Sequence, residues 1–253
     1  MMTAARNFPA RIGCAGWSVA TAHAHLFEGG GSVLARYASR FNAVEINSSF
    51  HRSHKRDTYQ RWSDAVPGNF RFTAKLPKWV THEQRLQGCG PSLDRFLLEV
   101  AGLGDKLAGL LVQLPPSLAY DARVAATFFA MLRRRTDLPL ACEPRHASWF
   151  EAPAESLWQR HSVTRVAADP ARLEAAQRVG GAGPWRYWRW HGSPRMYYSA
   201  YSDEALDELA AEIRRDTPAG VQAWILFDNT AHSHATNDAA RLQQRLSQGL
   251  QEP

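Results

Sequence analysis

Apolar runs rich in β-forming residues alternate with helical patterns along the chain, and this alternation constrains the fold more than any other feature. Several of the runs are apolar almost throughout, which is typical of parallel strands that are buried on both faces. The predicted strands are Arg11–Ala15, Ala43–Ile46, Arg71–Lys75, Gly109–Gln113, Pro139–Glu143, Val163–Ala168, Arg186–Trp190 and Ala223–Phe227.

An amphipathic segment follows each predicted strand. The predicted helices are Val33–Phe41, Asp57–Val66, Leu93–Leu103, Ala122–Arg135, Ala154–His161, Ala171–Arg178, Asp203–Arg215 and Ala235–Leu250. Candidate N-caps, whose side chains can accept a hydrogen bond from an amide of the first turn, are Ser92, Asp121, Ser202 and Thr236. This repeated pairing predicts an α/β fold, a (β/α)₈ TIM-like barrel formed by residues 1–253 as a single domain. An open doubly wound sheet is the alternative.

Length and composition fit a globular protein without a membrane span. The chain has 253 residues, of which 45% are hydrophobic and 21% are charged. No apolar run approaches the roughly 20 residues that cross a bilayer, and Met1–Ala10 lacks the apolar core of a secretory signal. We therefore expect a cytoplasmic protein that makes no membrane contact. Cys14, Cys89 and Cys142 form no CxxC pair, which argues against a disulfide framework and against a structural zinc site.

The excess of positive charge permits an anionic ligand. The formal net charge is +6 and the isoelectric point is about 9.5. Most of the basic residues are arginines, because only Lys55, Lys75, Lys78 and Lys106 are lysines. A basic chain can also bind nucleic acid, but the scattered arginines and the lack of a recognised nucleic-acid motif disfavour that partner.

Polar residues collect where the predicted strands end. The carboxyl ends of barrel strands form the active site in this fold class, and a buried polar group costs several kcal/mol unless it is paired. The ring of polar side chains therefore predicts a functional site. Its candidate residues are Glu45, Asn47, Lys75, Gln113, Glu143, Arg145, Arg189, His191 and Asn229. Trp17 after the first strand and Tyr198 after the seventh could form its walls, and Asn237 lies near the last helix start, where many barrels bind phosphate.

Four of these side chains are candidate catalytic groups. Glu45 and Glu143 are candidate acids or bases, and His191 is their candidate counterpart. Lys75 could hold an anion, or act as a base if it is desolvated. Structural alternatives stay open, because Lys75 could belong to an ion-pair network and His191 could be a hydrogen-bonded structural residue.

Taken together, the strand-end motifs resemble those of the YecE-like family (domain-of-unknown-function family 72) of TIM-barrel proteins. The matching stretches are Ile12–Ser18, Phe41–Phe50, Phe70–Lys75, Leu107–Pro116, Glu143–Phe150, Arg189–Gly192 and Phe227–Ala239. The resemblance implies a barrel and a shared strand-end pocket, and it brings no established reaction. The chain departs from the family at His51, where an aromatic residue is common, at Pro144, near which a phenylalanine is common, and at Asp228, where asparagine is common.

Three functional hypotheses follow from this pattern. The first is an acid–base enzyme, a hydrolase, lyase or isomerase, which acts on a small anionic or phosphorylated substrate held by Lys75, Arg145 and Arg189. The second is a metal-dependent hydrolase or isomerase for a sugar or phosphodiester. Its candidate ligands for a divalent ion are Glu45, Glu143, His191, Asp228 and His234. The third is a non-catalytic nucleic-acid-binding or regulatory protein. The sequence requires no cofactor and does not indicate an oligomeric state.

Overall fold

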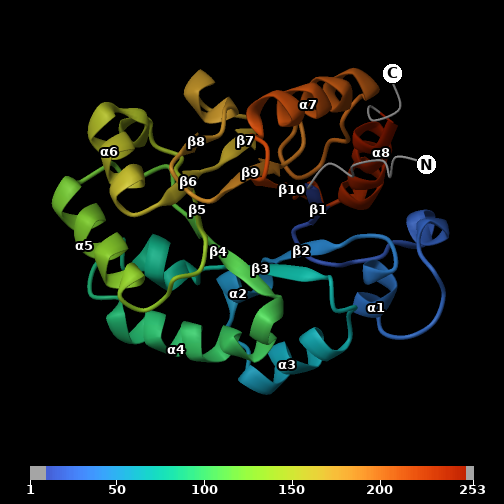
Figure 1. Cartoon of the computed structure of the whole chain (residues 1–253), viewed down its shortest axis with the longest axis horizontal. Helices are drawn as coiled ribbons and strands as arrows, with labels where there is room; N and C mark the ends of the chain where they lie inside the picture. Colours follow the sequence, from blue (N-terminus) through green and yellow to red (C-terminus); the bar gives the residue numbers. More distant parts are fainter. Residues whose placement is uncertain (1–9, 249–253) are drawn as a thin grey trace.

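The computed structural model describes residues 10–248, in which strands and helices alternate along the chain (Figure 1). The strands are β1 (Ala10–Cys14), β2 (Ala43–Ile46), β3 (Arg71–Lys75), β4 (Leu107–Gln113), β5 (Leu140–Glu143), β6 (Val163–Arg165), β7 (Ala167–Asp169), β8 (Gly180–Gly181), β9 (Trp185–Trp190) and β10 (Gln222–Phe227). The α-helices are α1 (Val33–Ala38), α2 (Ser48–His51), α3 (Arg56–Asp64), α4 (Gly90–Val100), α5 (Ala122–Arg133), α6 (Ala152–Arg160), α7 (Asp203–Asp216) and α8 (His234–Gln248).

The strands form two sheets whose ladders are parallel except for the pairing of β6 with β8. One sheet has the order β1-β10-β9-β7, and the other has the order β2-β3-β4-β5-β6-β8. A single parallel bridge between Ala15 and Glu45 connects the two sheets beside β1 and β2. On the other side, only Val166 separates β6 from β7. The fold is therefore a mixed α/β fold with parallel sheets.

The two faces of the strands pack in different ways. One face contacts the helices, and Figure 1 places α3 and α4 on the opposite side of the strands from α7 and α8. The other face holds a small cluster with members from both sheets, which we call the inner cluster. It consists of Ala43, Leu111, Ala141, Val166, Trp185, Tyr187, Trp224 and Leu226. The larger aliphatic and aromatic core lies between the strands and the helices, as expected for an α/β fold.

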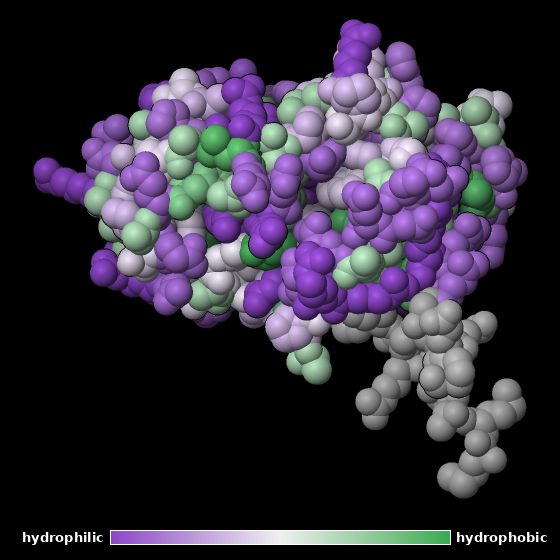
Figure 2. Space-filling model, turned by 90° about the horizontal axis from the view of Figure 1, so that it is seen from above, coloured by the Kyte–Doolittle hydropathy of each residue, from purple (hydrophilic) through white to green (hydrophobic). Residues whose placement is uncertain are grey.

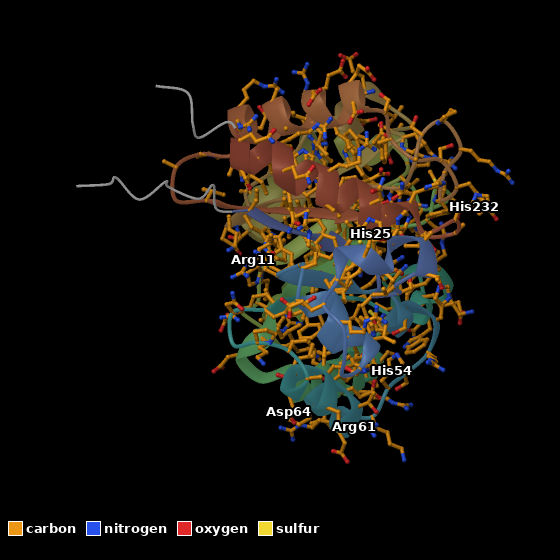
Figure 3. All side chains as sticks on the ribbon, turned by 90° about the vertical axis from the view of Figure 1, so that its right-hand side faces the viewer. Arg11, His25, His54, Arg61, Asp64 and His232 are labelled. Atoms are coloured by element: carbon orange, nitrogen blue, oxygen red, sulfur yellow. The ribbon has the colours of Figure 1, made fainter. Side chains whose placement is uncertain are left out.

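Parallel strands bring their carboxyl ends to one side of the molecule. Figure 3 shows Arg11, at the start of β1, and His232, after the end of β10, on opposite sides. One outer face, shown in Figure 2, is mostly hydrophilic, with hydrophobic residues in separate small patches. None of the helices within residues 10–248 is long and apolar enough to cross a membrane.

Most of the predicted elements are present, with one wrong helix and two wrong N-caps. The strands predicted at Ala43–Ile46 and Arg71–Lys75 coincide with β2 and β3. The helix predicted at Ala171–Arg178 is wrong, since its residues hold only a 3₁₀ turn at Glu174–Gln177. Directly after this turn the chain reverses its direction, and β8 pairs antiparallel with β6. The last residues of the helix predicted to reach Leu250 lie outside the described residues.

Two of the four predicted N-caps are confirmed. The side chains of Asp121 and Ser202 accept hydrogen bonds from the amides of Val124 and Ala205. Ser92 and Thr236 are wrong, because α4 begins two residues before Ser92 and α8 begins two residues before Thr236. Gly90 and Pro91 form the start of α4, so the helix begins before Ser92, the polar residue that the sequence pattern gives as its N-cap.

Candidate functional site

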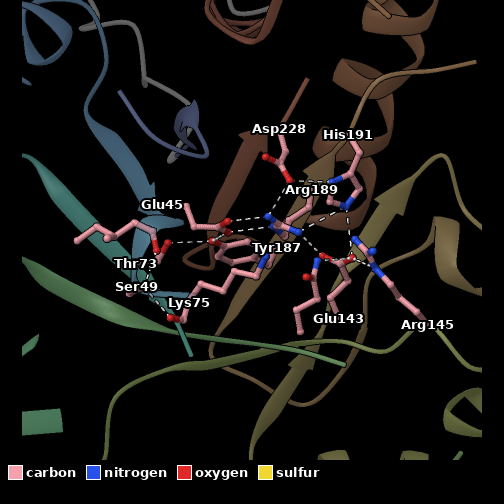
Figure 4. Close-up of polar contacts among 12 residues, drawn as sticks. Glu45, Ser49, Thr73, Lys75, Glu143, Arg145, Tyr187, Arg189, His191 and Asp228 are labelled. Carbon is pink, nitrogen blue, oxygen red and sulfur yellow. Dashed lines mark hydrogen bonds and ion pairs between the residues drawn. The ribbon is translucent and has the colours of Figure 1, made fainter. Parts of the chain in front are cut away.

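Arg189, near the end of β9, lies at the centre of the strand-end residues (Figure 4). Its side chain is fully buried, and its guanidinium contacts three carboxylates, two from β2 and β5 and one from the residue after β10. Nη2 donates to Glu45 Oε1 at 2.7 Å, and Nε donates to Glu45 Oε2 at 3.0 Å. Nη2 also donates to Asp228 Oδ2 at 3.1 Å, and Nη1 donates to Glu143. These bonds use four of the five N–H groups of the guanidinium, so the protein itself supplies the anions that Arg189 binds.

His191, just beyond β9, bridges two of the same carboxylates. Its Nδ1 lies 3.0 Å from Asp228 Oδ2, and its Nε2 lies 3.3 Å from Glu143 Oε1. Burial by itself would lower the pKa of His191, but the charge of Glu143 and the hydrogen bonds to both carboxylates outweigh burial and raise it. The imidazolium can donate to both neighbours at once, which fits a group that holds its proton near neutral pH.

Glu143 and Asp228 are held in the ionised form. Glu143 Oε1 accepts hydrogen bonds from Gln113 Nε2 at 3.1 Å and from Arg145 Nε at 2.8 Å. Burial opposes ionisation, yet Arg145 and Arg189 hold the pKa of Glu143 well below its ordinary value. The pKa of Asp228 is likewise lowered, since Arg189 and His191 overcome the effect of burial. Both groups act as fixed negative charges at neutral pH, and as proton acceptors they are weak.

Lys75 is the last residue of β3 and extends toward Arg189 (Figure 4). Its side chain is 5% exposed, and its Nζ lies 4.1 Å from the centroid of the Phe50 ring. Burial and the charge of Arg189 lower the pKa of Lys75 to about 8. Phe50 also contacts His82, whose ring centroid is 4.9 Å away. Burial, Lys75 and Arg145 lower the pKa of His82, which places this histidine in the field of both cations.

Three further polar atoms at the strand ends are buried and lack a partner among the described residues. They are Oδ1 of Asn47, directly after β2, Nη2 of Arg145, two residues after β5, and Oδ1 of Asn229, two residues after β10. Tyr197, in the loop before α7, is one of the groups that raise the pKa of Arg145. Tyr197 has a φ of 70°, a left-handed conformation that is uncommon for a non-glycine residue and costs of order 1–3 kcal/mol.

Asn229 and the last helix hold the loop after β9. Nδ2 of Asn229 donates to Asp238 Oδ2 at 2.7 Å and to Ser199 O at 3.0 Å. The same oxygen of Asp238 accepts from the amide of Tyr201 at 3.1 Å. The contacts of Asn229 therefore position the loop that carries Tyr197, and they fall on protein groups.

Three of the predicted binding residues lie away from Arg189. Trp17 packs edge-on against Trp62 of α3, with ring centroids 4.9 Å apart. Tyr198 is 38% exposed and lies under the guanidinium of Arg195 at 4.1 Å. Asn237 is half-buried on α8 beside Asp238. None of the three makes a hydrogen bond to the group around Arg189 in the part of the chain that the structure describes.

The sequence pattern missed several residues that complete the site. Asp228 is predicted only as a metal ligand, whereas it contacts both Arg189 and His191. Tyr187 donates from its hydroxyl to Glu45 Oε2 at 2.9 Å, and strand alternation could have found it, because it lies two residues before Arg189 on the same face of β9. His82 could not be found in this way, since it lies in a π-helical turn, Trp79–Glu83.

The geometry leaves little room for a metal ion at the carboxylates. Within residues 10–248, no group of three or more His, Cys, Asp or Glu side chains is placed to hold a metal ion. The space between Glu45, Glu143 and Asp228 contains the guanidinium of Arg189. His234 begins α8, where its ring lies 6.1 Å from that of His232. A small cavity beside Glu143, Arg145 and His191 has a volume of about 20 Å³, which suits roughly one water molecule.

Comparison with known proteins gives a family and no reaction. The family model described as "Protein of unknown function DUF72" matches residues 11–253. The UPF0759 protein YecE of Escherichia coli K12 is 27% identical over 57% of this chain and 54% of its own length. The UPF0759 protein YunF of Bacillus subtilis is 28% identical over 47% of this chain and 45% of its own length. The chain thus spans about half the length of the curated relatives it matches.

Solved structures share the fold. A DUF72 family protein from Thermotoga maritima has a TM-score of 0.77 at 20% identity, over 94% of this chain and 99% of that one. A DUF72 family protein from Enterococcus faecalis also reaches 0.77 at 20% identity, over 94% and 97%. The ICChI chitinase from Ipomoea carnea reaches 0.53 at 12% identity, over 94% and 100%. At these identities the likeness concerns the fold alone.

Proposed function

The chain belongs to the DUF72 family of proteins of unknown function, and from its strand-end geometry we propose that it is an enzyme that carries out acid–base chemistry on a small anionic substrate. One observation carries the proposal. Arg189 donates to three carboxylates of the protein, whereas the Nζ of Lys75 has no partner anion among the described residues, and Arg145 pairs with Glu143 through Nε but leaves Nη2 without an acceptor. Unused cationic donors beside a closed ion network favour an anionic ligand.

The pKa shifts indicate which of these side chains act as counter-charges and which transfer protons. Glu143 and Asp228 have lowered pKa values and serve as counter-charges. His191, with a raised pKa, and Lys75, with a pKa of about 8, are the groups that change protonation closer to neutral pH. Efficient proton transfer uses groups whose pKa lies near the working pH. His191 is therefore the proposed acid, and Lys75 is the proposed base and anion contact.

We also infer that the two sheets belong to one (β/α)₈ barrel. Apart from the short strand β8, which pairs with β6, the strands of each sheet follow chain order, and the first strand pairs with the last, whereas a doubly wound sheet reverses its strand order at a switch point. The bridge from Ala15 to Glu45 and the single residue Val166 between β6 and β7 lie where the two sheets would join. The barrel also accounts for the inner cluster, which draws on both sheets.

The test combines anion binding with turnover. We expect inorganic phosphate to raise the Tm of the protein, and the rise to disappear in Lys75→Met and to shrink in Arg145→Gln. Lys78→Met is the matched control, because Lys78 pairs with Glu83 at the surface. A mixture of phosphorylated and carboxylated metabolites, followed by mass spectrometry, should lose a component with the wild type and not with His191→Asn. Equal phosphate effects in all variants, with no component consumed, would refute the proposal.

A further inference from the structure

The amine of Lys75 differs from the other lysine amines in this chain. Lys78 pairs with Glu83 at 3.2 Å, and Lys106 donates to the carbonyls of Ser63 and Val66. Lys55 is exposed at the start of α3. Lys75 alone among the four is buried.

Nζ of Lys75 has no hydrogen-bond acceptor and no ion pair within residues 10–248, although the side chain extends toward the group around Arg189 (Figure 4). Other unpartnered atoms, such as Oδ1 of Asn47, are completely sealed from solvent, whereas Lys75 keeps 5% of its surface exposed. A ligand that binds this nitrogen does not have to displace a protein acceptor.

Burial also changes how often this amine is neutral. Because desolvation and Arg189 lower the pKa of Lys75 to about 8, roughly a tenth of the amine is neutral at pH 7. An ordinary lysine, with a pKa near 10.5, is neutral about 300-fold less often. Only the neutral amine has the electron pair that attacks a carbonyl carbon.

We propose that Lys75 is a nucleophile that forms an imine with the carbonyl group of an anionic substrate, a 2-oxo acid or an acidic aldehyde. This inference rests on the proposed anion site and names its substrate class. The nitrogen attacks the carbonyl carbon, and proton transfer from nitrogen to oxygen gives a carbinolamine. The hydroxyl then leaves as water with one proton from an acid, and the carbon–nitrogen double bond forms. No oxidant, reductant or further reactant is needed.

Neighbouring residues supply the other requirements of this reaction. Arg145, which pairs with Glu143 through Nε and leaves Nη2 unpartnered, supplies a second positive charge for the acid group of the substrate. His191, the acid of the proposed function, pairs with Glu143 and Asp228, and in this inference it protonates the leaving hydroxyl. The fixed carboxylates then stabilise the protonated imine, which carries one positive charge.

Reductive trapping tests the inference directly. The protein is incubated at pH 7 with glyoxylate and cyanoborohydride, and a reduced imine then appears as a carboxymethyl group on lysine. Peptide mapping by mass spectrometry separates Lys75 from Lys55, Lys78, Lys106 and the N-terminal amine. We expect Lys75 to be modified at least about tenfold faster than the other three lysines, as its larger neutral fraction requires. Its rate should level off above about pH 8, whereas the rates of the exposed lysines continue to rise.

Lys75→Arg and a neutral probe separate this inference from the proposed function. Arginine keeps the charge and cannot form the imine, so this variant should bind glyoxylate in calorimetry and carry no adduct at position 75. Glycolaldehyde, which is neutral, should label Lys75 more slowly than glyoxylate, and Arg145→Gln should remove that difference. Absence of a Lys75 adduct, or labelling no faster than that of Lys55, overturns the imine whether or not anions bind. If glyoxylate and phosphate both fail to bind, the proposed function is overturned as well.

Discussion

Two adjacent layers of side chains on the same strands differ in the kind of interaction that holds them. The inner cluster is aromatic and aliphatic, whereas the layer at the strand ends consists of Glu45, Glu143, Arg189, His191 and Asp228 and is called here the ionic cluster. On β9, Tyr187 belongs to the inner cluster, and Arg189, the next residue on the same face of the strand, belongs to the ionic cluster. Burial of an aromatic side chain contributes several kcal/mol, while buried ion pairs seldom stabilise a fold in net terms. The inner cluster therefore supports a layer that adds little stability of its own.

The largest effect is expected from Arg189→Met, because it removes the cation that three buried carboxylates share. We expect a loss of about 5 kcal/mol in the free energy of unfolding at pH 7. Glu143 and Asp228 would keep Arg145 and His191 but lose the cation they share, so their folded-state pKa values would rise from those of the wild type. The folded variant then binds more protons than the folded wild type, and the loss should shrink as the pH falls toward 4. Urea unfolding at several pH values measures both effects.

Arg186→Met is the matched control for that experiment. Arg186 lies on the other face of β9, is half-buried and donates only to the carbonyls of Gly183 and Trp185. Its replacement should cost about 1 kcal/mol or less, with no dependence on the protonation of carboxylates. If the two variants lost the same stability with the same pH profile, the ionic cluster would not be the separate layer described above.

The inner cluster should respond to mutation without any dependence on pH. Trp224 packs against Trp185 and is stacked on Tyr187, with ring centroids 5.4 and 6.2 Å away. We expect Trp224→Ala to lose about 4 kcal/mol through the cavity it leaves. The loss measured by urea unfolding should stay constant between about pH 5 and pH 9, since none of the rings titrates there. A pH-dependent loss would show that the two layers are coupled.

Sequence reasoning located the strand ends well because the relevant signal is local. Glu45, Lys75 and Glu143 each stand at or near the end of an apolar run, and the structure places all three there. The same local pattern failed at Ala171–Arg178, where the tertiary pairing of β8 with β6 decides the path of the chain.

The partners of Arg189 could not be predicted in the same way. From the sequence alone, an arginine at a strand end is predicted to be a free cation. In the structure, the guanidinium of Arg189 pairs with carboxylates from β2, from β5 and from the residue after β10. Only strand order and register bring these groups together. The distinction between a carboxylate-bound Arg189 and an unpartnered Lys75 is likewise a property of the assembled fold. Residue type alone gives both the same charge.

Lys75 should show the cost of keeping a charge at the border of the ionic cluster. Its pKa falls from 10.5 to about 8, and one pKa unit corresponds to about 1.4 kcal/mol, so the buried ammonium costs about 3 kcal/mol. We expect Lys75→Met to be more stable than wild type by about 2 kcal/mol at pH 7, because methionine keeps part of the packing against Phe50.

The pH dependence of this gain has a definite sign. The folded-state pKa lies below the unfolded one, so between pH 8 and pH 10.5 the unfolded wild-type chain holds more protons and wild-type stability rises with pH. The advantage of Lys75→Met should therefore be largest below pH 8 and fade toward pH 10.5. Denaturant unfolding of both proteins across this range checks it, with Lys78→Met as the control that shows no such trend. A constant advantage would mean that packing, and not desolvation of the amine, causes the gain.

The smallest expected effect comes from Tyr187→Phe, which tests the contact between the inner cluster and the ionic cluster. The ring of Tyr187 belongs to the inner cluster, while its hydroxyl donates to Glu45 Oε2 and lies 2.9 Å from Oγ1 of Thr73. Removing the hydroxyl keeps the ring and should cost about 1 kcal/mol, since Glu45 retains Arg189 as its partner. A double-mutant cycle with Glu45→Gln should give a coupling of about 0.5–1 kcal/mol that is absent between Trp224→Phe and Glu45→Gln. Equal couplings in both cycles would mean that the rings sense the charge of Glu45 directly, and that the hydroxyl is not the specific link between the two layers.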